Sequence, residues 1–157
     1  MQGLNVVILR PFNHIGPRQS QRFVASSFAR QIAEIEAGRA KPLLRVGNLE
    51  AYRDFTDVRD VVQAYLLAAR KATSGEILQV CSGRRVQILR ILDFYLAQAR
   101  LRVTVEQDPG RMRASEVPER WGSYRKLEAL TGWQPSRTLE NTLQDILDSW
   151  RSEIIRV

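Results

Sequence analysis

An apolar run at residues 4–9, followed at once by a polar loop, is the sequence feature that most constrains the fold. The run is rich in β-branched residues, which is typical of a strand buried on both faces of a parallel sheet. Arg10 and Pro11 end this strand. Asn13 and His14 then open the loop. Because open α/β sheets bind ligands at the carboxyl ends of their strands, the loop is predicted to line a ligand site.

Strand and helix patterns alternate along the rest of the chain, which is typical of the α/β class. Helices are predicted over residues 21–37, 58–71, 86–99 and 124–131, with a last helix capped by Ser136 or Thr138. Short strands are predicted at 43–46, 51–56, 77–80 and 103–105. For the second helix, Asp57 is the expected N-cap. Its inner face is predicted to contain Val58, Val61, Val62, Tyr65, Leu66 and Ala69.

Composition excludes several classes of protein. Hydrophobic residues make up 44% of the 157 residues and charged residues 26%, which disfavours a disordered chain. No apolar run approaches the roughly 20 residues of a membrane span, so no membrane contact is expected. The single Cys81 excludes an internal disulfide, is predicted to be a buried strand-end residue, and fits a cytoplasmic location.

The net charge of +7 comes almost entirely from arginine. The arginines are spread along the chain and are not interleaved with aromatic residues, so nucleic acid is not an expected partner. An anionic small molecule is the better match, because guanidinium groups bind phosphate bidentately.

The sequence lacks the motifs of several catalytic sites. No G-x-G-x-x-G loop is present to cradle a dinucleotide, and no tyrosine is followed by lysine at the fourth position. One histidine and one cysteine cannot make a zinc site by themselves. We therefore predict no catalytic residue and no metal site in this chain.

Three sets of polar residues remain as candidate binding groups. Asn13 offers amide donors to a diphosphate or a sugar, although it could instead only turn the chain. Arg53 precedes a helix and could bind phosphate, with Asp54 and Asp57 orienting it or capping the helix; a surface ion-pair cluster is the alternative. The third set is Arg113 and Glu116. The arginine could bind phosphate and the glutamate could accept hydrogen bonds from ribose hydroxyls; a solvated turn is the alternative.

Five motifs in a fixed order carry a family resemblance. They are RPFNHxGP from Arg10, VGNLEAxRDFxDVRDVVxAY from Val46, VCSG from Val80, RxSEVP from Arg113 and LTGWxP from Leu130. Together they resemble the extended short-chain dehydrogenase/reductases, and within them the branch that acts on GDP-sugars. The resemblance covers essentially the whole chain.

The resemblance implies the C-terminal part of such an enzyme. Residues 1–20 would contribute a late strand and loop of the Rossmann-type sheet, and residues 21–157 mostly the smaller α/β substrate-binding domain. The N-terminal cofactor-binding half would be absent. NADP or NAD would serve the complete enzyme, with neither bound by this chain alone. The missing half and a GDP-sugar are the expected partners, and the full-length form would be a homo-oligomer.

The resemblance also implies residue roles. Cofactor-binding residues near the nicotinamide would be Arg10 and His14. Substrate-binding residues would be Asn13, Arg53, Arg113 and Glu116. The wording of residues 55–60 favours a reductase of GDP-4-keto-6-deoxymannose over a GDP-mannose 4,6-dehydratase. A non-catalytic nucleotide-binding or oligomerisation module is the further alternative.

Overall fold

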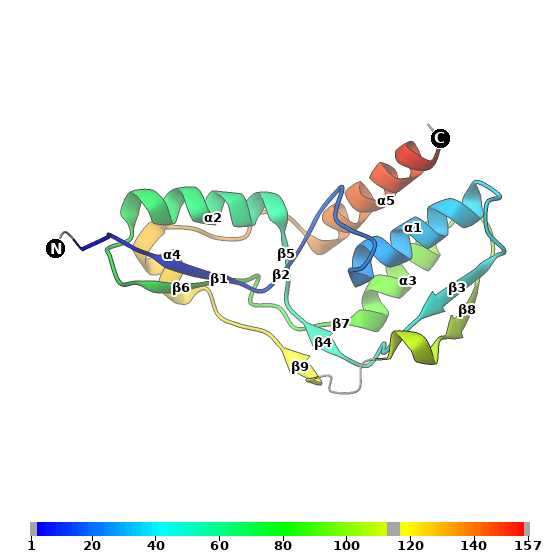
Figure 1. Cartoon of the computed structure of the whole chain (residues 1–157), viewed down its shortest axis with the longest axis horizontal. Helices are drawn as coiled ribbons and strands as arrows, with labels where there is room; N and C mark the ends of the chain where they lie inside the picture. Colours follow the sequence, from blue (N-terminus) through cyan, green and yellow to red (C-terminus); the bar gives the residue numbers. More distant parts are fainter. Residues whose placement is uncertain (1–2, 113–116, 156–157) are drawn as a thin grey trace.

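The computed structural model describes residues 3–112 and 117–155, and its elements form two groups along the long axis of the molecule (Figure 1). The first group contains strands β1 (Ile8–Pro11) and β6 (Ile77–Val80) with helices α2 (Val58–Lys71) and α4 (Arg125–Thr131). The second group contains helices α1 (Val24–Glu36), α3 (Ile88–Gln98) and α5 (Leu139–Ile155) with strands β3 (Leu43–Val46) and β8 (Thr104–Gln107).

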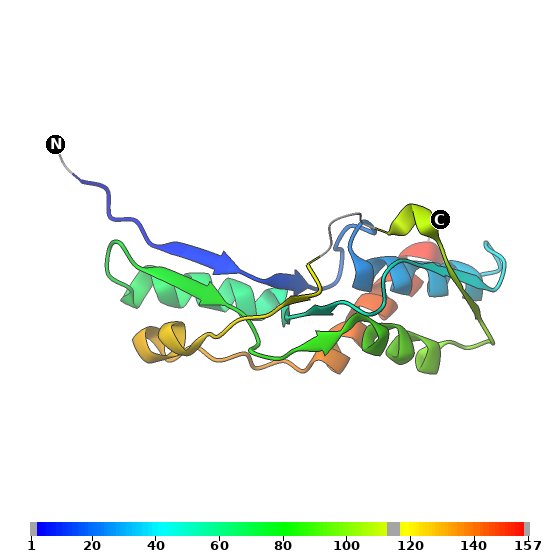
Figure 2. The ribbon, with the colours of Figure 1, turned by 90° about the horizontal axis from the view of Figure 1, so that it is seen from below.

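Short strands lie at the junction of the two groups, as Figure 2 shows from below. They are β2 (Asn13–Ile15), β4 (Tyr52–Arg53), β5 (Phe55–Asp57), β7 (Val86–Gln87) and β9 (Glu119–Arg120). β4 lies between β7, which is antiparallel to it, and β9, which is parallel. The pairs β1–β6, β2–β5 and β3–β8 are all parallel. Parallel strands whose connections contain helices confirm the predicted α/β class.

Each group has its own hydrophobic core. The core of the first group consists of Val61, Ala64, Ala68, Leu78, Val80, Leu127 and Trp133. The core of the second group is larger, and its biggest fully buried side chains are Tyr95, Ile32, Leu44, Ile91, Leu143, Ile146 and Leu147. The first group is thus assembled from three separate parts of the chain: β1 near its start, the segment from α2 to β6, and the segment that contains α4.

Helix α2 spans the predicted residues, Val58–Lys71. Asp57 caps it as predicted, since its carboxylate accepts a hydrogen bond from the backbone N–H of Arg59 at 2.8 Å. Asp60 in the first turn and basic residues in the last turn complement the helix dipole. Local sequence signals therefore fix both ends of this helix.

The other predicted helices form with their ends displaced by at most three residues. Gly132 ends α4 with a φ of 76°, a left-handed conformation that glycine adopts without strain. Thr138 is the cap of α5, because its Oγ1 accepts a hydrogen bond from the backbone N–H of Asn141 at 3.2 Å. The hydroxyl of Ser136, the other candidate, donates to Asp60 at 2.7 Å.

The first strand begins later than the sequence suggests. β1 starts at Ile8, which pairs with Ile77 at the beginning of β6. Val6 is half exposed, and residues 4–7 have no strand partner among the described residues. The predicted bounds of 4–9 are therefore wrong, because the partner strand β6 begins opposite Ile8 and the pairing continues through Pro11. Residues 13–15, predicted to open a loop, form β2 instead, because they pair with β5. Ile8 is 45% exposed in this chain, so the predicted burial on both faces is not seen here.

Helix α2 turns a different face inward from the one predicted. Val61 is buried as expected, but Ala64 and Ala68 complete the inner face. These alanines follow Val61 at helical spacing, and they belong to the same core cluster as Leu78 and Val80 of β6. Larger apolar residues predicted to be inside are 47–52% exposed: Val62, Tyr65 and Leu66.

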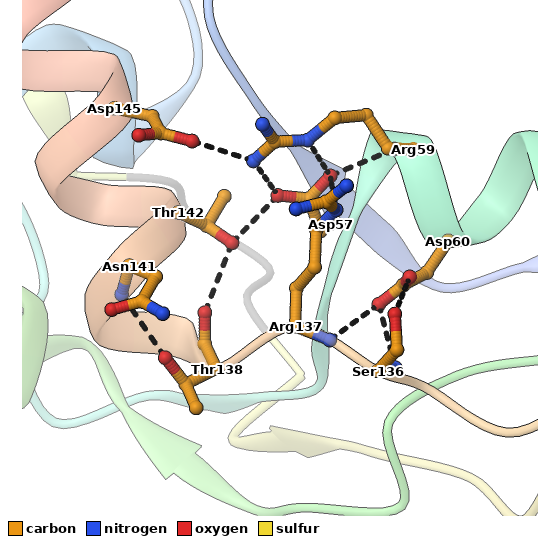
Figure 3. Close-up of polar contacts among 9 residues, drawn as sticks. All are labelled: Asp57, Arg59, Asp60, Ser136, Arg137, Thr138, Asn141, Thr142 and Asp145. Atoms are coloured by element: carbon orange, nitrogen blue, oxygen red, sulfur yellow. Dashed lines mark hydrogen bonds and ion pairs between the residues drawn. The ribbon is translucent and has the colours of Figure 1, made fainter.

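A buried acidic network joins the start of α2 to α5 (Figure 3). Asp57 accepts hydrogen bonds from Arg59 Nη2 at 2.6 Å and from Thr142 Oγ1 at 2.7 Å. Asp60 accepts bonds from the backbone N–H of Ser136 at 3.0 Å and from its hydroxyl. Since these partners come from separate segments, the two carboxylates hold the two groups of elements together.

Two kinds of site are absent from the described residues. No helix there has the length and apolar character needed to cross a membrane. No cluster of His, Cys, Asp and Glu side chains in the same residues could hold a metal ion.

Cys81 is buried directly after β6, as predicted. Burial and the neighbouring Asp54 raise the pKa of its thiol to about 11, which keeps it protonated at neutral pH.

Candidate functional site

A cavity of about 850 Å³ opens beside the loop between β2 and α1. That loop, the first turn of α1, the segments after β3 and at β4, and the 3-10 helix η1 (Pro109–Arg111) form its wall. These segments lie near the junction of the two groups in Figure 1. Cavities of about 300–1,000 Å³ typically hold small-molecule ligands, so this one has room for a nucleotide.

Asn13 presents an unpaired donor at this cavity. It lies in β2 opposite Phe55 of β5 and is among the lining residues. Its side-chain Nδ2 is buried and has no hydrogen-bond partner among the described residues. Buried amide groups in native proteins are nearly always paired, so this N–H is well suited to an oxygen atom of a ligand.

Arg53 lines the same cavity from the central strand of the β7–β4–β9 sheet. Its Nη1 donates to the carbonyl oxygens of Tyr52 at 2.7 Å and Pro118 at 3.3 Å. These bonds hold the guanidinium at the cavity wall. The fold therefore brings together Asn13 and Arg53, which are distant in the sequence.

Asp54 has a structural role next to this arginine. It is fully buried, and its carboxylate accepts hydrogen bonds from the backbone N–H of Ser82 at 2.7 Å and of Gly83 at 2.9 Å. The Ser82 hydroxyl adds a third bond at 2.8 Å. Asp54 thus ties the loop after β6 to β4, while the capping role suggested for it belongs to Asp57.

Three further arginines make the cavity strongly cationic. Arg18, Arg22 and Arg111 line it together with Arg53, and none of the described lining residues is acidic. Arg18 has a φ of 66°, an uncommon left-handed conformation for a residue other than glycine. Backbone strain of this kind clusters at ligand sites. An anion is therefore the ligand that this cavity favours.

A close backbone contact places Arg111 at the cavity. A Cβ atom on Gly47 would lie 2.5 Å from the carbonyl oxygen of Arg111, so only glycine allows η1 to pack against the segment after β3. The Arg111 guanidinium then donates to Ser27 Oγ of α1 at 3.3 Å and lies 3.4 Å from an Asp108 oxygen. This arginine therefore spans from η1 toward α1.

The residues predicted to bind a cofactor do not lie together at this cavity. His14 is exposed and lines it, with its ring Nδ1 3.3 Å from the carbonyl oxygen of Phe12. Arg10 is exposed on β1 and is not a lining residue. The predicted Arg113 and Glu116 lie outside the described residues, although Arg111 lines the wall.

Sequence reasoning missed several lining residues in the β2–α1 loop, among them Arg18, Gln19 and Arg22. The available signal was the density of polar and cationic residues between Pro17 and Phe23. Without the fold, such a stretch is typical of an ordinary solvated loop.

The cavity offers binding groups more than reacting groups. His14 is the only histidine of the chain, and no described lining residue is a carboxylate, a lysine or a thiol. General acid–base chemistry needs a donor and an acceptor with suitable pKa values within reach of the reacting atoms. The described wall can therefore bind and orient an anion but lacks an evident acid–base pair.

Comparison with known proteins places these features in a family. The model of the family described as GDP-mannose 4,6 dehydratase matches residues 1–146. The chain is 39% identical over 153 residues to the GDP-6-deoxy-D-mannose reductase of Pseudomonas aeruginosa, a match covering 98% of this chain and 50% of that protein. It is 22% identical over 156 residues to GDP-mannose 4,6 dehydratase 2 of Caenorhabditis elegans, covering 88% and 40%.

Solved structures agree with this assignment. RMD from Pseudomonas aeruginosa, complexed with NADPH, matches with a TM-score of 0.88 and 38% identity over 95% of this chain and 49% of that chain. A UDP-glucuronic acid 4-epimerase from Bacillus cereus, with a TM-score of 0.80 and 23% identity over 96% and 46%, shares the fold.

The chain thus spans about half the length of the relatives it matches, and it corresponds to their C-terminal half. The predicted Rossmann-type fold and GDP-sugar branch are confirmed. The chain belongs to the GDP-mannose 4,6 dehydratase family.

Proposed function

We propose that this chain is the substrate-binding half of an NAD(P)-dependent reductase that acts on GDP-4-keto-6-deoxymannose. The observation that carries the proposal is the cationic cavity, where four arginines and the unpaired Nδ2 of Asn13 meet without an acidic residue among the described lining residues. A nucleotide diphosphate matches this set in charge and in size. The identity of 39% with a GDP-6-deoxy-D-mannose reductase supports the sugar.

Each binding residue has a proposed role. Asn13 donates a hydrogen bond to a diphosphate oxygen, and Arg53 pairs with the same diphosphate through its planar guanidinium. Arg113 and Glu116 bind a phosphate and the ribose hydroxyls of the GDP moiety. This second pair of roles rests on the family resemblance of the motif.

The residues present fit only one end of a nicotinamide cofactor. Arg10 and His14 are exposed near the junction of β1 and β2, where we propose that they meet the nicotinamide. The sequence has no glycine-rich loop for the cofactor diphosphate, so we expect this chain alone to bind neither NADPH nor NADH. When bound in the complete enzyme, the cofactor supplies the hydride for the C4 ketone.

The contribution of this chain to catalysis is orientation. Asn13 and Arg53 hold the diphosphate, and this remote binding energy fixes the sugar so that its C4 atom faces the hydride donor. A GDP-mannose 4,6-dehydratase, in which the hydride leaves C4, is the alternative that the family description favours. A binding module without catalysis is the third candidate.

Asn13→Ala is expected to weaken GDP-mannose binding by about 10-fold to 150-fold, because a charge-assisted hydrogen bond to the diphosphate contributes about 1.5–3 kcal/mol. Calorimetric titration of the 157-residue chain measures the dissociation constant. The matched control is Gln63→Ala, which removes an exposed amide on α2 outside the cavity wall and should bind GDP-mannose as the wild type does. Binding of UDP-glucose in preference to GDP-mannose would contradict the GDP assignment.

The first group of elements leaves apolar surface open for a partner, and we propose that the other half of the enzyme covers it. β1 pairs only with β6 among the described residues, so its other edge is available for a parallel strand. Exposed apolar residues occur on both strands of this pair and on α2: Ile8, Ile77, Val62, Tyr65 and Leu66. A cytoplasmic location and a full-length homo-oligomer remain predictions.

Co-expression with the half of the Pseudomonas aeruginosa reductase that this chain does not match is expected to give a complex that co-purifies and oxidises NADPH with GDP-4-keto-6-deoxymannose. Tyr65→Glu should abolish the complex by placing a charge in the apolar contact, whereas the exposed Gln63→Glu on the same helix should not. If the complex converts GDP-mannose instead, the enzyme is a dehydratase. If it binds the GDP-sugar without turnover, the chain is a binding module without catalysis. Absence of any complex would refute the docking surface.

A further inference from the structure

Gln19 holds a second unpaired polar atom at the same cavity. It lies in the β2–α1 loop and is a lining residue. Its side-chain Nε2 donates to the carbonyl oxygen of His14 at 2.7 Å. Its Oε1 is buried and has no hydrogen-bond partner among the described residues. The amide is therefore satisfied on one side only.

The position of this amide is fixed by its surroundings. The backbone carbonyl of Gln19 accepts a hydrogen bond from Ser26 Oγ at 2.6 Å, and Ser26 Oγ in turn accepts one from Trp150 Nε1 at 2.9 Å. Ser26 is fully buried in α1. The loop that contains Gln19 is thus anchored to both α1 and α5, so its side chain is presented at a defined place.

The orientation of the amide follows from its hydrogen bond. If the oxygen and nitrogen of Gln19 were exchanged, its oxygen would face the carbonyl oxygen of His14, and two acceptors would repel one another. Oε1 is therefore the unpaired atom. Two residues that line the cavity thus each have one buried, unpaired atom, an acceptor in Gln19 and a donor in Asn13.

We propose that Gln19 is a specificity-determining contact, with its Oε1 accepting a hydrogen bond from an O–H or N–H group of the bound nucleotide sugar. This inference rests on the proposed function. Phosphate oxygens satisfy the donor of Asn13 but not the acceptor of Gln19, because an ionised diphosphate offers acceptors only. A ligand that carries both a diphosphate and a hydroxyl or amino group satisfies both atoms. Gln19 therefore selects nucleotide sugars over simple phosphate compounds.

Gln19→Met tests the proposal, because methionine has a similar length and lacks the acceptor oxygen. In calorimetric titrations of the full chain, the variant is expected to bind GDP-mannose about threefold to tenfold more weakly than the wild type, the effect of one neutral hydrogen bond. Pyrophosphate binding is expected to be unchanged. Gln63→Met, at an exposed position on α2, is the matched control and should leave both affinities unchanged.

Three ligands identify the donor. If Gln19→Met loses affinity for GDP-mannose but not for GDP, the donor to Gln19 Oε1 is a hydroxyl of the sugar. If the variant loses affinity for GDP but not for inosine diphosphate, the donor is the amino group of guanine. An equal loss of affinity for all three assigns a ribose hydroxyl or the N1–H group that guanine and hypoxanthine share. Each of these results supports the proposal.

Two results would overturn it. One is unchanged GDP-mannose binding in Gln19→Met. The other is an equal loss of pyrophosphate affinity, which would show that the bond to His14 merely holds the loop and Asn13 in place. If the wild-type chain binds neither GDP-mannose nor pyrophosphate, the proposed function itself is wrong. Failure of the Gln19 proposal is a different result, in which the wild-type chain binds GDP-mannose and Gln19→Met binds it equally well.

Discussion

Asp57→Ala is expected to lower the free energy of unfolding by about 2–4 kcal/mol, because it removes the N-cap of α2 together with several hydrogen bonds to a buried charged group. The Asp57 carboxylate is fully buried and binds the backbone N–H of Arg59, the Arg59 guanidinium and the Thr142 hydroxyl (Figure 3). Its loss removes the cap of α2 and the contact with α5 together. For a chain of this size the melting temperature should fall by about 10 °C in calorimetry or circular dichroism.

A matched control separates buried from exposed partners of the same arginine. Asp145 also pairs with Arg59, at 2.7 Å, but its side chain is 44% exposed. Asp145→Ala should therefore cost about 1 kcal/mol or less. Equal effects of the two substitutions would show that the buried position of Asp57 is unimportant.

The effect of Asp57 also depends on pH. Burial acts to raise the pKa of this carboxyl, but hydrogen bonds from Arg59 and Thr142 outweigh burial and lower the pKa below its usual value of 3.8. A carboxyl with a lowered pKa in the folded state contributes its stability above the unfolded pKa and loses it as the pH falls through the folded pKa. The difference between wild type and Asp57→Ala should thus be constant near neutrality and shrink below about pH 4.

Arg53→Ala is expected to weaken GDP-mannose binding by about 30-fold or more, since truncation of a charged group that binds an opposite charge away from solvent costs about 2–5 kcal/mol. Arg53 is half-buried, and its guanidinium donates to the carbonyl oxygens of Tyr52 and Pro118. Calorimetric titration of the full chain with GDP-mannose measures the loss. Circular dichroism should report an unchanged fold.

Arg53→Lys provides the sharper control. Lysine keeps the charge but cannot bind two phosphate oxygens with a planar fork, so its affinity should lie between those of wild type and alanine. Wild-type affinity in Arg53→Ala would remove this residue from the site. Equal affinity of the lysine variant and the wild type would show that charge alone matters there.

The sequence located the elements better than it located their faces. The cap at Asp57 and the helix over Val58–Lys71 depend on local signals, and both form as predicted. The inward face of that helix depends on what packs against it, and here Ala64 and Ala68 displace the larger Tyr65. The same reason explains β1, whose start at Ile8 is set by the extent of β6 and not by the apolar run itself.

The candidate site was predictable in part. The motifs pointed to Asn13, Arg53 and His14, and all three line one cavity in the structure. They gave no indication of Arg18 or Gln19, since a polar loop residue has the same appearance in a sequence whether it faces solvent or a ligand. Only its distance from other segments distinguishes the two cases.

Periodicity, capping and ordered motifs are local properties of the chain, so the amino-acid sequence was enough to establish the α/β class, the family and the residue types suited to a diphosphate. Which of these groups meet depends on the packing of distant segments. Arg111 reaches the cavity through the close approach that Gly47 allows, and Gln19 is fixed there by an anchored loop. The Oε1 atom of Gln19 is unpaired because packing buries it while the Nε2 atom of the same amide donates to the carbonyl oxygen of His14. No local sequence pattern predicts such a contact.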